Sequence, residues 1–384
     1  MDSKELEILK KAEVRDLIER NIERDATRIA LDKSIAYPRE VASQVKYLQR
    51  ARKKLPSYYA ARAVLPSLAF EQSSSEECAA HKEFSGTLAI DMTCGLGVDT
   101  LYLSRRFERV VAIERNPELA DITRHNLALM GVNNVEIVVG DSGEYVASLD
   151  HADLIYADPD RRSSDGRKMV CLEDCSPNIA SLLPMLRSKA DNICVKLSPM
   201  FDLTEARRAF GPEARLEVVS LGGECKEVLV SLRNGDTHGS VAATALGVGT
   251  FEVEAQQLAE FHPSGSDFTP ELFSHIVVPD AALRKAGLVD MWCEAEGMKA
   301  HGGYGFCTQK PSEKTMGHCY EIELATAYRP KELKRLVSEK IEVIRHGFPH
   351  PTAAICKALG VKEGAGQRWA FAEIGHSLWA FRLK

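Results

Sequence analysis

Residues 91–100, DMTCGLGVDT, decide the fold of this chain. They follow the short apolar run LAI (88–90) and contain Gly95 and Gly97, which allow a tight turn and a close approach of the backbone to a ligand. A buried strand that leads through a glycine-rich turn into a helix is typical of an open α/β sheet that binds a nucleotide-like ligand at this turn. Because a single G-x-G pattern fits many cofactors, the identity of the ligand depends on the rest of the chain.

The downstream sequence continues the same pattern of short apolar runs and helix-like segments. The further runs are VVAI (110–113), VEIVV (135–139), ADLIYA (152–157) and NICVKL (192–197), and the helix-like segments lie near residues 99–106, 117–130, 142–149 and 176–189. This alternation predicts a parallel sheet with helices on both faces. Two alternating runs joined by Gly222-Gly223 predict an antiparallel hairpin at residues 215–232. We therefore expect a doubly wound, seven-stranded Rossmann-like sheet that ends in this hairpin.

The flanking sequence predicts two further regions. Residues 1–70 repeat apolar positions at three- and four-residue spacing, which is typical of helices, and residues 71–87 (EQSSSEECAAHKEFSGT) have the composition of a linker or flap. The segment after residue 235 contains a glycine-rich loop (301–306), a helix at 331–339, a strand at 341–345, a short helix at 352–359 and the strands RWAFAE and SLWAFRL. We expect three regions: helices and flap at 1–84, a ligand-binding α/β domain at 85–235, and a small α/β domain at 236–384.

The composition is that of an ordinary globular protein. The 384 residues are 45% apolar and 27% charged, with a net charge of −6. The sequence contains no apolar stretch of the length that spans a bilayer, and its charged N-terminus lacks the apolar core of a secretory signal, so we expect a cytoplasmic protein. Its ten cysteines include no C-x-x-C pair. Cys171 and Cys175 come closest to a metal spacing, but no matching Cys/His pair follows, so no metal site is expected.

Acidic residues end four successive predicted strands. Asp91, Glu114, Asp141 and Asp158 would lie at one edge of the sheet, since the carboxyl ends of parallel strands meet there. A carboxylate in the place of Glu114 can accept hydrogen bonds from both hydroxyls of a ribose, and one in the place of Asp141 can accept from an adenine amino group. The pattern therefore predicts a site for an adenosine-containing ligand.

The first turn favours S-adenosylmethionine over a dinucleotide. A dinucleotide places its pyrophosphate at the helix N-terminus after this turn, where Asp99 and Asp91 would repel it. The third glycine of the dinucleotide fingerprint is replaced by Thr100. S-adenosylmethionine carries no phosphate, and acids attract its ammonium and sulfonium groups.

These motifs together resemble the class I S-adenosylmethionine-dependent methyltransferases over about residues 85–235. The resemblance implies that S-adenosylmethionine is the cofactor; the residues expected to bind it are Asp91, Thr93, Gly95, Gly97, Asp99, Glu114, Asp141, Ser142 and Asp158. The segments EQSSSE, VVPDAALRKAGLV (277–289) and IEVIRHGFP are similar to a bacterial methyltransferase group with a THUMP-like C-terminal domain. THUMP domains generally belong to RNA-modifying enzymes, so the resemblance implies a base in tRNA or rRNA as the substrate.

The stretch YADPDRR (156–162) carries the expected catalytic residues. Family members that methylate exocyclic amines have Asn/Asp-Pro-Pro-aromatic after strand four, in which the acid and a carbonyl beside the proline accept hydrogen bonds from the amine. This chain has Asp158-Pro159-Asp160-Arg161, with arginine in place of the aromatic residue. We expect Asp158, Pro159 and Arg161 to position the methyl acceptor. Carbon-5 pyrimidine methylation is disfavoured, because Ser198 occupies the place of the required thiol and Cys194 lies within a strand.

Other polar residues have two interpretations each. Arg161 and Arg162 either bind substrate or pair with Asp160 and Asp165. Lys196 and Gln72 are candidate substrate contacts. Gln72 and Ser75 either close over the methionine end of the cofactor or belong to an ordinary connector.

The basic stretch 41–70 is the candidate nucleic-acid face in the N-terminal region. It contains six Lys/Arg residues and three tyrosines without an acid, which fits nucleic acid or a solvated helix face. The alternatives to an RNA methyltransferase are a methyltransferase acting on a small molecule or protein, a non-catalytic S-adenosylmethionine- or RNA-binding module, and an NAD-dependent oxidoreductase.

Overall fold

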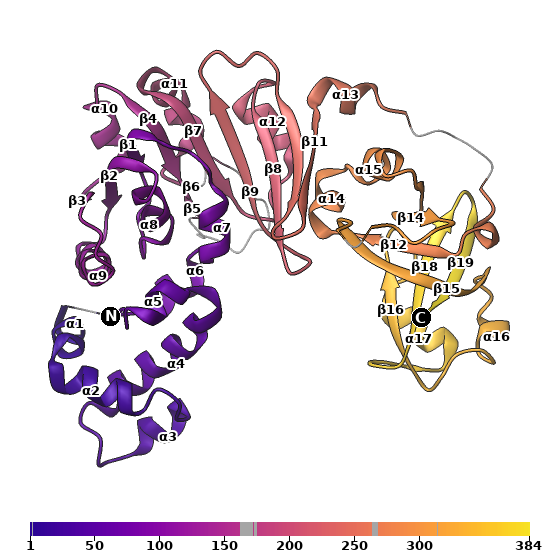
Figure 1. Ribbon diagram of the computed structural model, residues 1–384, viewed down its shortest axis with the longest axis horizontal. Coiled ribbons are helices and arrows are strands. Elements are labelled where there is room, and N and C mark those ends of the chain that lie inside the picture. The colour runs from indigo at the N-terminus through magenta and orange to yellow at the C-terminus, as the bar shows by residue number, and fades with distance from the viewer. Residues whose placement is uncertain (2, 162–171, 173–174, 263–267, 313) are drawn as a thin grey trace. The chain divides into compact units, whose positions relative to one another are not determined.

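The described residues of the chain form two compact units. The structure, a computed structural model, describes residues 1–384 apart from residues 2, 162–171, 173–174, 263–267 and 313. The first unit contains Met1–Ala214 and Leu229–Thr237, and the second contains Arg215–Val228 and His238–Lys384. The domain boundaries expected from the sequence, 84/85 and 235/236, stay a prediction. Figure 1 shows the chain coloured from the N-terminus to the C-terminus.

The first unit begins with helices, as the apolar periodicity of residues 1–70 predicts. They are α1 (Ser3–Lys10), α2 (Ala12–Arg20), α3 (Ala26–Leu31), α4 (Pro38–Lys54), α5 (Pro56–Ala60), α6 (Ser67–Gln72) and α7 (Glu76–His81). Helix α7 occupies much of the segment predicted as a linker, where Ser75 accepts a hydrogen bond from the backbone N–H of Cys78 and so caps the helix.

The sheet of the first unit confirms the predicted parallel strands. Its strands are β1 (Gly86–Asp91), β2 (Phe107–Glu114), β3 (Val135–Val139), β4 (Ala152–Ala157), β7 (Ala190–Leu197) and the last residues of β9 (Glu224–Arg233). Their order is β9-β7-β4-β1-β2-β3, with parallel register from β7 to β3. The strand order reverses between β1 and β4, and ligands of open α/β sheets bind at such a point.

The connecting helices begin directly after the strand ends. They are α8 (Val98–Ser104), α9 (Pro117–Leu129), α10 (Ser142–Ala147), α11 (Ile179–Lys189) and α12 (Leu203–Phe210). Asn116, Asp141, Asn178 and Asp202 cap α9 to α12 by accepting backbone N–H bonds. The short antiparallel pair β5 (Asp160–Arg161) and β6 (Cys175–Ser176) follows β4. Helices α8 and α9 share one apolar core with the N-terminal helices, so both parts contribute to one folded unit.

The second unit begins with the predicted hairpin and extends it. Strand β8 (Arg215–Leu221) and the first residues of β9 are joined by Gly222 and Gly223, both at positive φ. Two more strands follow, β10 (Ser240–Ala245), which pairs in parallel with β8, and β11 (Gly249–Glu254), which pairs antiparallel with β10. Strands β10 and β11 extend the sheet beyond the predicted hairpin, and the sequence did not indicate them because the alanine-rich run of β10 gives no clear strand signal.

The rest of the second unit is a separate eight-stranded sheet with short helices. Its strands, in the order β13-β14-β12-β15-β19-β18-β16-β17, are β12 (His275–Pro279), β13 (Lys299–His301), β14 (Tyr304–Cys307), β15 (Gly317–Ala327), β16 (Lys340–Arg345), β17 (Lys362–Glu363), β18 (Gln367–Ile374) and β19 (Ser377–Leu383). Its helices are α13 (Ala255–Glu260), the 3₁₀ turn η2 (Pro270–Leu272), α14 (Ala281–Ala286), α15 (Val289–Ala295), α16 (Pro330–Leu333) and α17 (Thr352–Leu359).

Two apolar clusters, around Phe306 and around Trp369, form the core of this sheet. The predicted strand at 341–345, the helix at 352–359 and the two terminal strands are confirmed, whereas the helix predicted at 331–339 is reduced to α16. Among the described residues, no helix is long and apolar enough to cross a bilayer.

Candidate functional site

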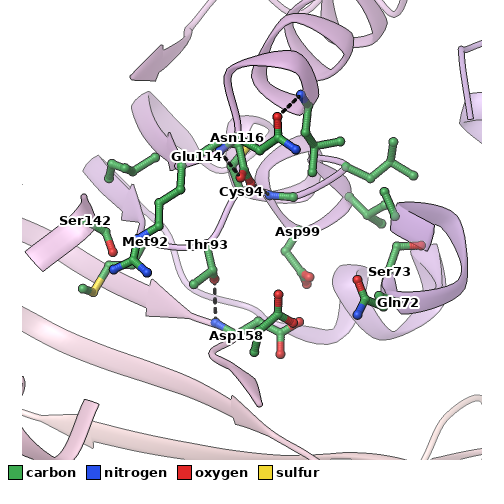
Figure 2. Close-up of a pocket in the computed structure, with 18 of the residues that line it drawn as sticks. Gln72, Ser73, Met92, Thr93, Cys94, Asp99, Glu114, Asn116, Ser142 and Asp158 are labelled. Atoms are coloured by element: carbon green, nitrogen blue, oxygen red, sulfur yellow. Dashed lines mark hydrogen bonds between the residues drawn. The ribbon is translucent and has the colours of Figure 1, made fainter. Parts of the chain in front are cut away.

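A cavity of about 440 Å³ lies at the carboxyl ends of the strands in the first unit. Residues from helix α6, the turn after β1 and the ends of β2 and β4 line it. Figure 2 shows that the side chains of Asp99, Asp158 and Gln72 converge on one part of the cavity, while Glu114 and Asn116 lie in another. The cavity is therefore at the switch point of strand order, where the sequence predicts ligand binding.

The side chain of Asp91 holds the turn after β1 in place. This side chain is 1% exposed and accepts hydrogen bonds from the Thr100 hydroxyl at 2.6 Å and the Thr93 backbone N–H at 3.0 Å. Burial raises the pKa of Asp91 to about 7. Asp91 is absent from the cavity lining, whereas Thr93 belongs to it. Asp91 therefore holds the turn in shape, and the cofactor contact expected of it stays a prediction.

The two glycines of the turn are required by its backbone and packing. Gly95 and Gly97 have φ of +54° and +81°, values that L side chains rarely adopt. A Cβ atom at Gly97 would lie 2.5 Å from Cγ2 of Thr123. The backbone N–H of Gly95 donates to Oε2 of Glu114 at 2.9 Å. The close turn predicted from the G-x-G pattern is therefore present, and it is tied to the acid at the end of β2.

Glu114 is held in one orientation by backbone groups. Its Oε2 accepts from Gly95 as described, and its Oε1 accepts from the Asn116 backbone N–H at 2.8 Å. Each carboxylate oxygen has two lone pairs, so both can accept a second hydrogen bond from a vicinal diol. The apolar side chains of Ile113, Leu119 and Ile122 line the same cavity. This combination of a fixed carboxylate and apolar walls fits a nucleoside.

The acid after β3 has a structural task of its own. Oδ1 of Asp141 accepts from the backbone N–H groups of Gly143 (2.8 Å) and Glu144 (3.1 Å), and Oδ2 pairs with Arg115. The backbone hydrogen bonds from α10 and the Arg115 charge hold the pKa of Asp141 below its ordinary value. The cavity lining includes neighbouring Ser142 but not Asp141. The adenine contact expected of Asp141 stays a prediction.

Five polar residues form a continuous chain of contacts beside the cavity. Lys82 Nζ lies 3.0 Å from Asp99 Oδ1, and the Ser74 hydroxyl donates to Asp99 Oδ2 at 2.9 Å. Lys196 Nζ donates to the Ser74 hydroxyl at 3.0 Å and pairs with Asp158 Oδ2. We call these residues the charge chain. Each acid of the charge chain has a lysine partner, so the rim is less acidic than the sequence predicts.

The acids of the charge chain have shifted pKa values in opposite directions. Burial would raise the pKa of Asp99, but the charges of Lys82 and Lys196 hold it below its ordinary value. Burial raises the pKa of Asp158, and the Lys196 charge opposes that rise. The side chain of Lys196 is 12% exposed and that of Asp158 is 34% exposed, so their pairing is partly shielded from water.

The DPDRR segment is only partly described. Asp158 donates its backbone N–H to the Thr93 hydroxyl at 2.7 Å, which ties the end of β4 to the turn after β1 (Figure 2). Pro159 is buried, and Asp160 lines the cavity. The backbone of Arg161 lies in β5 opposite Cys175. Arg162 lies outside the described residues. The roles predicted for Pro159, Arg161 and Arg162 stay predictions.

The residues of the predicted flap have different positions in the structure. Gln72, at the end of α6, lines the cavity, as do Ser73 and Ser74. Ser75 caps α7 instead. Ser74, Lys82 and Asn116 were not predicted as site residues, although a run of three serines before the sheet was a signal for Ser74.

The structure also bears on metal binding and on the basic stretch 41–70. Within the described parts of the chain, no group of three or more His, Cys, Asp or Glu side chains could hold a metal ion; Cys171 lies outside them. In the basic stretch 41–70, Arg50 pairs with Glu71, Arg52 with Glu23 and Arg62 with Glu19. Lys54 donates to the carbonyl of Phe70, while Tyr47 and Tyr58 are buried. The second interpretation of this stretch, a helix face with inward tyrosines, fits these contacts.

Comparisons with known families identify two regions of the chain. Residues 86–160 match the family described as RNA cap guanine-N2 methyltransferase, and residues 317–383 match the family described as THUMP domain-like. The first match contains the turn after β1, Glu114 and Asp158, and the second contains most of the C-terminal sheet.

Individual relatives of this chain are also described as methyltransferases. A crystal structure from Porphyromonas gingivalis W83, of a protein provisionally classed as a methyltransferase, superposes with a TM-score of 0.82 at 25% identity and covers 100% of this chain and 98% of that one. An uncharacterised S-adenosylmethionine-dependent methyltransferase of Mycobacterium tuberculosis is 28% identical over 235 residues, 58% of each chain. An uncharacterised RNA methyltransferase of Halalkalibacterium halodurans is 30% identical over 93 residues, 23% of this chain and 20% of its own. The chain thus spans little more than half the length of the Mycobacterium relative.

Proposed function

We propose that this chain, which has one region similar to RNA cap guanine-N2 methyltransferases and one similar to THUMP domains, transfers the methyl group of S-adenosylmethionine to a base in RNA. The observation that carries the proposal is the cavity at the switch point, where Glu114 is fixed by two backbone N–H groups and Asp158 lies at the end of β4. The RNA substrate is supported by the THUMP-like match and by the RNA methyltransferase relative.

The cavity residues fit the parts of the cofactor. Glu114 would hold the ribose diol, and Ile113, Leu119 and Ile122 would contact the apolar faces of the adenosine. The polar methionine end, with one ammonium and one carboxylate, would lie beside Ser74, Asp99 and the lysines of the charge chain. A region with equal numbers of acids and lysines suits such a zwitterion better than a pyrophosphate. When bound, the cofactor supplies a methyl group activated by the positive sulfur.

Asp158 and its neighbours would act by positioning the acceptor. Lys196 holds Oδ2 of Asp158, and Thr93 holds its backbone N–H, so the carboxylate has a defined orientation. A hydrogen bond from the acceptor to Asp158 or to the Pro159 carbonyl would direct the acceptor lone pair at the methyl group. Such orientation alone accelerates a transfer strongly, and no strong base is required.

The test of the proposal has two parts. Calorimetry with S-adenosylhomocysteine and with NAD should show binding of the first only; the reverse would overturn the cofactor assignment. The protein is then incubated with radiolabelled S-adenosylmethionine and separated cellular RNA, protein and metabolites. Label should enter the RNA fraction. Label confined to protein or metabolites would support the alternative substrate class and overturn the RNA assignment.

A further inference from the structure

On the second unit, Arg284 contacts His346, which lies 62 positions later in the sequence and directly follows Arg345. Arg284 lies in the last turn of α14, Arg345 ends β16, and His346 follows it. Nη1 of Arg284 lies 2.6 Å from Nδ1 and 3.0 Å from Nε2 of His346. We call these three residues the basic cluster. A close turn supports it, because a Cβ atom at Gly303 (φ +80°) would lie 3.1 Å from Cβ of His346.

The positive charges of Arg284 and Arg345 influence the pKa values of both His346 and Tyr304. Burial and the charges of Arg284 and Arg345 lower the pKa of His346 to about 4, so its ring is neutral at pH 7 and can accept from Arg284. Burial raises the pKa of the neighbouring Tyr304, and both guanidinium charges oppose that rise. The histidine therefore orients one arginine without adding or removing charge.

The guanidinium groups of the basic cluster have no acidic partner among the residues that the structure describes. Among the described residues, no carboxylate forms an ion pair with Arg284 or Arg345, although carboxylates pair with Arg329, Arg368 and Arg382 in the same unit. Nε of Arg345 lies 3.3 Å from the Thr352 hydroxyl, which carries no charge. Both arginine side chains belong to exposed residues. The charges of both arginines act on His346, and a bound anion would supply the counter-ion that the described residues do not provide.

The C-terminal segment that contains Arg345 and His346 has the opposite charge balance to the whole protein. Residues 317–384 contain 11 Lys/Arg and 7 Asp/Glu, whereas the whole chain has a net charge of −6. A local positive surplus on an acidic protein favours a polyanion at that location. Guanidinium groups are well suited to phosphate, because their planar N–H donors match two of its oxygens.

We infer that the basic cluster binds a backbone phosphate of the RNA substrate. The inference rests on the proposed function, since it names where that RNA is held. Arg284 and Arg345 would contact a phosphodiester group while His346 keeps the Arg284 guanidinium in place. Phosphate contacts of this kind fix the position of a nucleic acid without reading its sequence.

Fluorescence anisotropy with a fluorescein-labelled RNA hairpin tests the inference on the full-length protein. Replacement of both arginines (R284A/R345A) should weaken binding about tenfold, and the slope of log K against log salt should fall by about 0.7–0.9 for each arginine. The KM for RNA in the methylation assay should rise while kcat changes little. The charge-conserving R284K/R345K variant should retain most of the salt dependence.

Matched controls separate the possible outcomes. Arg329→Ala removes an exposed arginine of the same unit that is paired with Glu332, and it should leave affinity and slope unchanged. Circular dichroism and S-adenosylhomocysteine binding confirm that the variants fold. If the wild type binds and methylates RNA but R284A/R345A matches it, the inference is wrong and the proposed function stands. If the wild type neither binds nor methylates RNA, both fail. Displacement of the RNA by inorganic phosphate at matched ionic strength would assign the cluster to free phosphate instead.

Discussion

The charge chain beside the cavity and the basic cluster of the second unit use charge in opposite ways. In the charge chain, Lys82 pairs with Asp99 and Lys196 with Asp158, so little net charge remains and each side chain has a fixed place. In the basic cluster, two arginines lie around a neutral histidine without an acidic partner among the described residues. Paired charges orient groups for a bound molecule and its chemistry, whereas unpaired charges attract a partner of opposite sign. Variants of the two regions should therefore fail in different assays.

The largest effect is expected at Asp158. Asp158→Ala should lower methyl transfer about a thousandfold, because the acceptor loses the group that orients it. S-adenosylhomocysteine affinity and the salt dependence of RNA binding should stay within about twofold of the wild type. Radiolabel transfer, calorimetry and anisotropy measure the three quantities.

Asp158→Asn is the matched control, since it retains one acceptor oxygen and should be intermediate in rate. Melting temperatures exclude unfolding as the cause. Turnover equal to the wild type would refute the role of Asp158, and an RNA affinity reduced as much as in R284A/R345A would break the contrast between the two regions.

The next effect concerns the cofactor alone. Glu114→Ala should weaken S-adenosylhomocysteine binding about a hundredfold, since the ribose diol loses a charged acceptor and the N–H groups of Gly95 and Asn116 lose theirs. RNA affinity should not change. Calorimetry measures the first quantity and anisotropy the second. Glu118→Ala changes a partly exposed acid in the first turn of α9 and should be neutral; equal effects of both variants would exclude a specific role for Glu114.

A smaller effect is expected from the lysine partner of Asp158. Lys196→Met should lower transfer about tenfold near pH 7, with part of the loss recovered at higher pH. The sign follows from the pair: Lys196 opposes the rise that burial causes in the pKa of Asp158, so its removal raises that pKa further. The ionised fraction of Asp158 then falls at a given pH, and the acidic limb of the pH–rate profile moves to higher pH.

Lys196→Arg is the control for this prediction, because it keeps the charge and should keep the wild-type profile. A Lys196→Met profile that is lowered uniformly, without a shift along the pH axis, would mean that the lysine acts only through structure.

The strands could be predicted from the sequence better than the pairing of charged side chains in the two regions. The parallel strands follow from apolar runs of the right length, and Glu114 and Asp158 follow from their place at strand ends. The contacts between side chains do not follow from the sequence. Ser74 and Lys196 are separated by 122 residues, and Arg284 and His346 by 62. Such contacts depend on the tertiary fold, which no local pattern encodes. In the stretch 41–70, a local count of charged residues gave a surplus of positive charge. The acids that pair with its arginines lie outside the stretch, so the count did not include them.

The smallest effect is therefore expected in helix α4, where the sequence alone suggested a nucleic-acid face. Arg52 pairs with Glu23 and lies over the ring of Tyr59, 5.0 Å from its centroid. Because its charge is already compensated, Arg52→Ala should change RNA affinity by less than about twofold and leave the salt slope unchanged, as expected for an exposed ion pair. Glu23→Ala tests the same point from the other side: it frees Arg52 and should slightly strengthen RNA binding if α4 lies near the RNA. Anisotropy across a salt series measures both variants. A loss for Arg52→Ala as large as that for R284A/R345A would show that ion pairing does not decide which basic region binds, and the contrast between paired and unpaired charges would then have to be abandoned.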